Sequence, residues 1–171
     1  MSKKVNEKWT AKRVIKEIIT TLLMLFVISM GLNYLRQPEI NEHIYDYERS
    51  DIKEHKINFN DYKGKPLVVH FWGTWCPTCK LEASNIEVIS SKHNVVSIAV
   101  NSGSNETIDL FMKEHDLSYR VINDAEGTLA KKFNIEVYPT TLIYNSKGVL
   151  KFTEVGYSTS LGLKARLGLI D

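Results

Sequence analysis

The two cysteines of the chain, Cys76 and Cys79, directly follow a short run of β-branched and aromatic residues, 67–72. Such a run is typical of a buried strand, and we expect a helix to begin at about Cys76 and to continue to Ser91. In a helix, residues three positions apart have Cα atoms roughly 5 Å from each other, which suits a disulfide. Because the chain has no other cysteine, any intramolecular disulfide joins this pair.

The predicted position of Cys76 at the start of a helix favours a reactive thiolate. Unpaired N–H groups and the helix dipole stabilise negative charge there, and the thiolate is the nucleophilic form of cysteine. Cys79, one turn further on, is expected to be more buried and to stay protonated until it resolves a mixed disulfide formed on Cys76. Pro77 suits the first helical turn because its missing N–H is not needed there.

Strand and helix patterns alternate along the rest of the chain. Strands are predicted at 95–100, 119–122, 140–144 and 149–155, and helices at 105–115, 128–133 and 158–169. The alternation predicts the α/β class, with a mostly parallel sheet, helices on both faces and an antiparallel hairpin at the end.

The segment FWGTWCPTCK at 71–80 and the V-Y-P-T motif at 137–140 resemble the thioredoxin superfamily. The resemblance covers about residues 14–171 and implies a thioredoxin fold, with a central mixed sheet and helices on both faces. The helix and strand predicted over about 105–122 are similar to the central α-β insert of membrane-anchored, exported thioredoxin-like proteins, a group that includes cytochrome c maturation proteins. The turn at 122–127 and the chain end are similar to protein disulfide oxidoreductases of the suppressor-of-copper-sensitivity D and TlpA-like type.

The resemblance also assigns roles around the cysteine pair. Pro139 is expected to follow a cis peptide bond and to face the disulfide, where Tyr138 offers backbone groups to an extended client peptide. Trp75 is expected to cover the disulfide. Pro77 and Thr78 lie between the cysteines and belong to the elements that tune the redox potential, although they do not fix the direction of exchange.

Two further residues have alternative interpretations. Glu82 lies three positions after Cys79, and its carboxylate either raises the pKa of that thiol and accepts its proton or is simply solvated. His70 stands where thioredoxin itself has a buried aspartate. It is either a core histidine with its hydrogen bond satisfied or a proton relay.

The N-terminal part of the chain has a basic tail, 1–17, followed by an uncharged and mostly apolar run, 18–35. A helix of that length spans roughly 27 Å, close to the ~30 Å hydrocarbon core of a bilayer. We expect a single-pass transmembrane anchor in the bacterial inner (cytoplasmic) membrane, with the catalytic domain on the periplasmic or outer side. A cleaved signal peptide and a buried core helix are the alternatives. Residues 36–61 are expected to form a linker and edge strand, and 62–171 the thioredoxin-like domain.

These features predict a membrane-anchored thiol-disulfide oxidoreductase that acts on exported proteins, as a reductant. Its partners would be clients with thiols or disulfides, a membrane electron-transfer protein, and the lipid bilayer through residues 18–35. No bound cofactor and no metal ligand are expected, and the slightly acidic body beyond the basic tail argues against nucleic acid. The alternative is a copper(I)-binding or metal-carrier module that uses the same cysteines, since soft thiolates suit copper(I). A role in copper tolerance is implied by the resemblance alone.

Overall fold

The computed structural model describes residues 11–35, 38, 40 and 44–170, and the chain divides into two units, 1–36 and 37–171. Helix α1 (Ala11–Leu35) is the described part of the first unit. Among the described residues, no helix combines the length and the apolar character needed to cross a membrane.

This finding overturns the expected transmembrane anchor over 18–35. The physical reason lies in the charge content of α1. Placing an ionised side chain in the hydrocarbon of a membrane is costly, most of all at its centre. The stretch 12–29 of the helix includes the charged residues Lys12, Arg13, Lys16 and Glu17.

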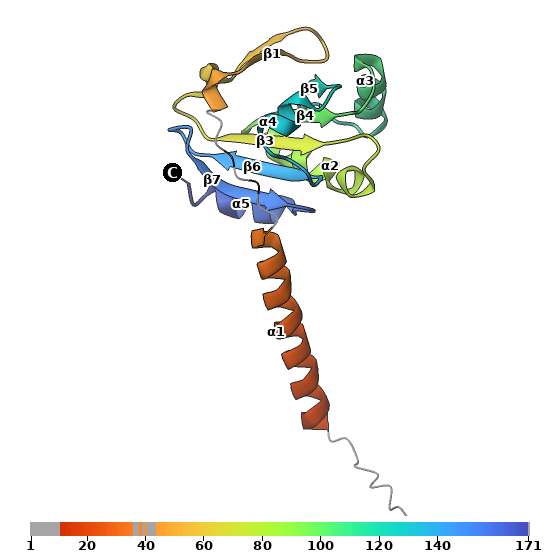
Figure 1. Ribbon diagram of the computed structural model, residues 1–171, viewed down its shortest axis with the longest axis vertical. Coiled ribbons are helices and arrows are strands. Elements are labelled where there is room, and N and C mark those ends of the chain that lie inside the picture. Colours follow the sequence, from red (N-terminus) through yellow and green to blue (C-terminus); the bar gives the residue numbers. More distant parts are fainter. Residues whose placement is uncertain (1–10, 36–37, 39, 41–43, 171) are drawn as a thin grey trace, which may run out of the picture. The chain divides into compact units, whose positions relative to one another are not determined.

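The second unit is built on a sheet in which the described strands follow the order β5-β4-β3-β6-β7 (Figure 1). Strand β4 pairs in parallel with β3 and β5, whereas β6 is antiparallel to both β3 and β7. The sheet is therefore mixed, and the expected thioredoxin fold is confirmed. The strands are β3 (Leu67–Trp72), β4 (Asn94–Val100), β5 (Arg120–Asp124), β6 (Thr140–Tyr144) and β7 (Leu150–Val155).

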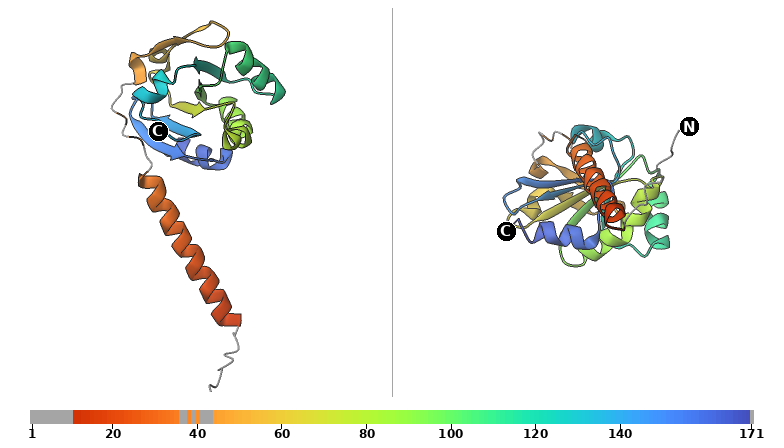
Figure 2. Two further views of the ribbon diagram at one scale, coloured as in Figure 1. Left: turned by 45° about the vertical axis from the view of Figure 1, so that its right-hand side comes forward. Right: turned by 90° about the horizontal axis from the view of Figure 1, so that it is seen from below.

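Helices cover both faces of the sheet (Figure 2). Strand β3 is buried at every position, so its alternating side chains contribute to two separate cores. Val68 and Trp72 pack with residues of α2, α3 and α5, whereas Val69 and Phe71 pack with residues of α4. The helices are α2 (Pro77–Ser90), α3 (Asn105–Glu114), α4 (Thr128–Lys132) and α5 (Ser160–Leu167).

A small hairpin precedes the main sheet. It consists of β1 (Glu48–Ser50) and β2 (Lys56–Asn58), which pair antiparallel and are flanked by the 3₁₀ turns η1 (Ile44–Asp46) and η2 (Phe59–Tyr62). The N–H of Ile52, in its turn, donates to the carbonyl of Val121 at 2.9 Å, so the hairpin is joined to the outer edge of β5.

Strand β5 differs from the sequence expectation, because it extends to Asp124 instead of ending at Ile122. The reason is a capping interaction across the turn. The buried Asp124 carboxylate accepts hydrogen bonds from the N–H groups of Leu129 and Ala130, at 3.1 and 2.9 Å. The aspartate therefore ends the strand and caps α4, although its residue type suggested a turn.

Candidate active site

The two cysteines form a disulfide at the N-terminus of α2, with Cα atoms 5.2 Å apart. Cys76 is the N-cap residue, and its Sγ accepts a hydrogen bond from the Cys79 N–H at 3.2 Å. Pro77 occupies the first helical turn and is exposed, and Thr78 is half-buried. Both cysteines are buried, and Cys76, 4% exposed, is slightly more accessible than Cys79, 1% exposed.

The loop before β6 lies against this disulfide. The peptide bond between Tyr138 and Pro139 is cis, as expected. The carbonyl oxygen of Tyr138 lies 3.8 Å from Cys76 Sγ, and the carbonyl of Pro139 accepts a hydrogen bond from the N–H of Gly156 at 2.8 Å. The loop is thereby fixed to the end of β7, with its backbone beside the more accessible sulfur.

Trp75 lies next to the same loop. Its ring edge packs against Tyr138 with the centroids 5.5 Å apart, and its Nε1 donates to the carbonyl of Val100 at 3.0 Å. The ring is nevertheless 52% exposed, so it presents apolar surface beside the disulfide. Gly73 makes this arrangement possible, because a Cβ there would approach the Trp75 ring to 2.6 Å.

Glu82 is fully buried in α2, which rules out the alternative of a solvated carboxylate. Its Oε1 accepts a hydrogen bond from the Ser158 N–H at 2.8 Å, whereas Oε2 has no hydrogen-bond partner within the described part of the chain. The pKa of Glu82 is raised to about 7, chiefly by burial and also by the charge of Glu154, against the opposing hydrogen bonds from Ser158. Glu82 and Cys79 are three residues apart, so they lie on the same side of α2. A carboxyl that changes charge near neutral pH can accept a proton there.

His70 is buried in β3, on the sheet face that α2 covers. Its Nδ1 lies 2.9 Å from the hydroxyl of Thr141, and burial lowers its pKa to about 3. The imidazole is therefore neutral and hydrogen-bonded at physiological pH, which favours the interpretation as a satisfied core histidine.

The sequence did not single out Asn85 or Ser158, which support Glu82 from outside the motif. Asn85 donates to the Ser158 carbonyl at 3.2 Å and to the hydroxyl of Tyr157 at 3.0 Å. The partners are more than seventy positions apart in the chain, so no local pattern reports the contact.

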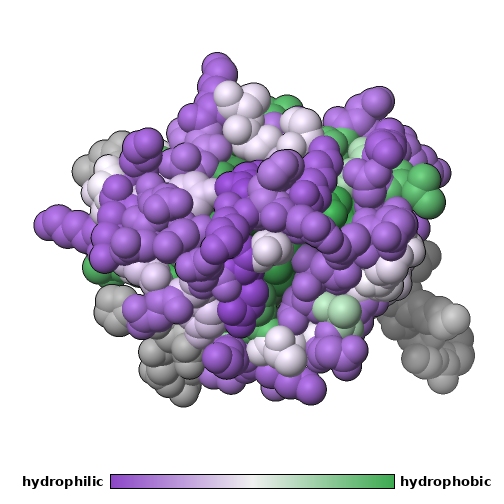
Figure 3. Space-filling model, turned by 90° about the horizontal axis from the view of Figure 1, so that it is seen from above, coloured by the Kyte–Doolittle hydropathy of each residue, from purple (hydrophilic) through white to green (hydrophobic). Residues whose placement is uncertain are grey.

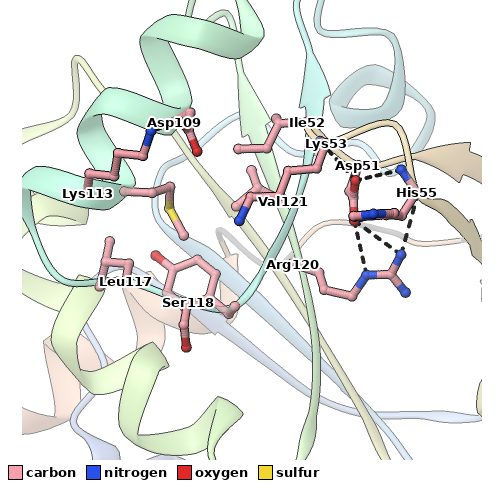
Figure 4. A pocket seen from close by; sticks show the side chains of 12 residues that line it. Asp51, Ile52, Lys53, His55, Asp109, Lys113, Leu117, Ser118, Arg120 and Val121 are labelled. Atoms are coloured by element: carbon pink, nitrogen blue, oxygen red, sulfur yellow. Dashed lines mark hydrogen bonds and ion pairs between the residues drawn. The ribbon is translucent and has the colours of Figure 1, made fainter.

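A separate cavity of about 310 Å³ lies between the hairpin turn, α3 and β5. It contains none of the residues expected to form the redox site. Figure 4 shows Arg120 beside Asp51, whose Oδ2 accepts hydrogen bonds from Arg120 Nε and Nη2 at 3.3 and 3.2 Å.

Seen from above, the surface is mostly hydrophilic, and hydrophobic side chains appear in small patches (Figure 3). Within the described residues, no cluster of three or more His, Cys, Asp or Glu side chains could hold a metal ion.

Comparisons with known proteins agree with this geometry. A thioredoxin-like protein of Haemophilus influenzae is 28% identical over 158 residues, which cover 91% of this chain and 94% of the relative. The sporulation thiol-disulfide oxidoreductase A of Bacillus subtilis is 32% identical over 109 residues, 60% of this chain and 66% of that protein. The crystal structure of StoA from Bacillus subtilis superposes with a TM-score of 0.60 at 27% identity, covering 70% of this chain and 94% of StoA. Since the model of the AhpC/TSA family matches residues 40–153, well over half of the sequence, the chain belongs to this thioredoxin-like family.

Proposed function

We propose that the protein is a thiol-disulfide oxidoreductase that exchanges disulfides with partner proteins through Cys76 and Cys79. The observation that carries the proposal is the disulfide at the N-terminus of α2, with the Tyr138 carbonyl 3.8 Å from the accessible sulfur. The similarity to a relative named as a thiol-disulfide oxidoreductase supports the same activity.

The exchange proceeds in two sulfur transfers. The Cys76 thiolate attacks one sulfur of a partner disulfide; the partner S–S bond breaks, and a mixed disulfide forms while the second partner sulfur leaves as a thiolate. The Cys79 thiol then loses its proton to a base, for which we propose the Glu82 carboxylate, and its thiolate attacks Cys76 Sγ. The mixed disulfide breaks, the Cys76–Cys79 disulfide forms, and two electrons have passed to the partner. Its two thiolates take up one proton from Glu82 and one from solvent, which restores the Glu82 carboxylate.

The direction that we propose is reduction of partner disulfides, with a dithiol donor restoring the reduced pair. A strong oxidant of this kind owes its potential to a stabilised reduced form. Cys76 Sγ accepts one N–H hydrogen bond, from Cys79, and lies close to the carbonyl oxygen of Tyr138, whose partial negative charge disfavours a thiolate. The Tyr138 carbonyl thus offsets part of the thiolate stabilisation from the N-terminus of α2, and this supports a potential at the reducing end of the range.

We further propose that the partners are exported proteins. A basic stretch, 1–17, precedes an apolar run in the sequence, and this is the order that an export signal has. Expression of the full chain with a reporter fused after residue 171 would test this, because activity of a reporter that matures only outside the cytoplasm is expected.

The activity is tested by insulin reduction with dithiothreitol as the donor. Cys76→Ala is expected to abolish turnover, whereas Cys79→Ala is expected to retain the first step and to accumulate mixed disulfides visible on non-reducing gels. Equilibration of the wild-type pair with glutathione gives the direction: a potential below about −220 mV identifies a reductant, and one near −120 mV an oxidant. Undiminished turnover of Cys76→Ala would refute the mechanism.

A further inference from the structure

Ser158 is held at both of its backbone groups by two residues of α2. Its N–H donates to Glu82 Oε1 at 2.8 Å, and its carbonyl accepts from Asn85 Nδ2 at 3.2 Å. The same Asn85 amide donates to the hydroxyl of Tyr157 at 3.0 Å. Because Glu82 and Asn85 are three residues apart on α2, they lie on the same side of the helix and both hydrogen-bond to Ser158 in the facing loop.

This loop connects β7 to α5 and is anchored at its two ends by other contacts. Gly156 donates to the Pro139 carbonyl, and Thr159 caps α5 by accepting from the N–H of Gly162 at 3.1 Å. Between these anchors, Ser158 contacts α2 through its backbone and its hydroxyl. The position of the Ser158 N–H at the Glu82 carboxylate therefore depends in part on the bond that Asn85 makes to the Ser158 carbonyl, besides the contact of the Ser158 hydroxyl with Glu82.

We propose that Asn85 is a positioning residue of the redox site: by holding the Ser158 carbonyl, it keeps the Ser158 N–H on the Glu82 carboxylate and so controls the readiness of that carboxylate to accept the Cys79 proton. The inference rests on the proposed exchange activity and adds a residue to it. Asn85 is half-buried and carries no charge, so it acts through the loop and not through its own electrostatic field.

Other charged or titratable groups around Glu82 come from three elements. Glu154 on β7 raises the pKa of Glu82 and is ion-paired with Arg166 on α5. Tyr119, in the segment before β5, interacts with the Glu82 charge, and its own pKa is raised, chiefly by burial, far above neutrality. None of these groups contacts Asn85 in the described hydrogen bonds, so replacing Asn85 leaves their charges in place.

The first test is a direct titration of the Glu82 carboxyl by carbon-13 NMR in the oxidised full chain, which requires no activity. Because a hydrogen bond to the charged form lowers a carboxyl pKa, Asn85→Leu is expected to raise the Glu82 midpoint by about one pH unit. Tyr157→Phe removes only the outer bond of Asn85 and is expected to produce a smaller shift. Ser84→Ala, on the exposed side of the same helix, is the matched control and should leave the midpoint unchanged. An unshifted midpoint in folded Asn85→Leu would overturn the inference, whatever the activity.

The second test is the pH profile of the resolving step, measured in single turnovers from a preformed mixed disulfide on Cys76. Asn85→Leu is expected to move the profile to higher pH by the same amount, which slows resolution about five-fold at pH 7. In a Glu82→Gln background, Asn85→Leu should produce no shift; a shift that persists there would also overturn the inference. If the wild type forms no mixed disulfide at all, the proposed function fails while the NMR result still decides what Asn85 does to Glu82.

Discussion

Replacement of Glu82 by glutamine should stabilise the protein in a strongly pH-dependent way. The glutamine keeps the side-chain shape and an oxygen that can accept the Ser158 N–H bond, but it does not ionise. Burial raises the pKa of Glu82 from 4.5 to about 7, so the folded state binds this proton more tightly than the unfolded state. The corresponding stability is fully present below pH 4.5 and is lost as the pH rises through 4.5 to about 7.

The size of this effect follows from the same interval. Between 4.5 and about 7, the difference in proton affinity corresponds to roughly 3 kcal/mol of unfolding free energy. Wild type and Glu82→Gln should therefore differ little in pH dependence below pH 4.5, whereas at pH 8 the variant should have gained up to about 3 kcal/mol relative to wild type.

The measurement is urea unfolding of the oxidised protein at pH 4.5, 6, 7 and 8, for wild type and variant. Other titrating groups, such as His70, contribute equally to both proteins and cancel in the difference between them. Parallel stability curves across this pH range would refute the reasoning, because they would mean that Glu82 ionises in the folded protein as easily as in the unfolded chain.

Three further perturbations have defined outcomes. Burial lowers the pKa of His70 to about 3, so the free energy of unfolding should fall as the pH drops from about 6.5 towards 3. Acid unfolding of His70→Leu should lack this loss of stability. An acid transition identical to that of the wild type would contradict the prediction. Asp51→Ala leaves Arg120 without its buried carboxylate partner and should cost about 2–3 kcal/mol in urea unfolding, whereas a cost below about 0.5 kcal/mol would show that the pair is unimportant. Gly73→Ala should displace the Trp75 ring, which would appear as a changed tryptophan emission spectrum and slower insulin reduction; an unaltered spectrum would argue against the close approach.

The sequence predicts the main sheet well because its strands are buried on both faces. Segments such as 67–72 and 140–144 are rich in β-branched and aromatic residues, and every position in them is buried. The placement of the cysteine pair at the start of α2 follows from the same strand-to-helix pattern, and so does the cis bond before Pro139 through the family resemblance.

The surroundings of Glu82 could not be predicted in the same way. A carboxylate one turn into a helix is ordinarily solvated, and its burial here depends on a loop more than seventy residues away in the chain. The transmembrane prediction is wrong for a different reason: the apolar run 18–35 belongs to a longer helix, α1, which also includes the charged residues at 12–17.

The hydrogen bond between Ile52 and Val121 has a consequence for the behaviour of the protein at high concentration. Strand β5 is an outermost strand of the sheet, and exposed edges of this kind recruit strands from neighbouring molecules. The hairpin turn occupies part of that edge with a backbone bond of 2.9 Å, and charged side chains, Lys53 and Arg120, flank it. The hairpin turn therefore makes part of the β5 edge unavailable for pairing with strands of other molecules, which disfavours self-association and amyloid-like growth on this side of the domain.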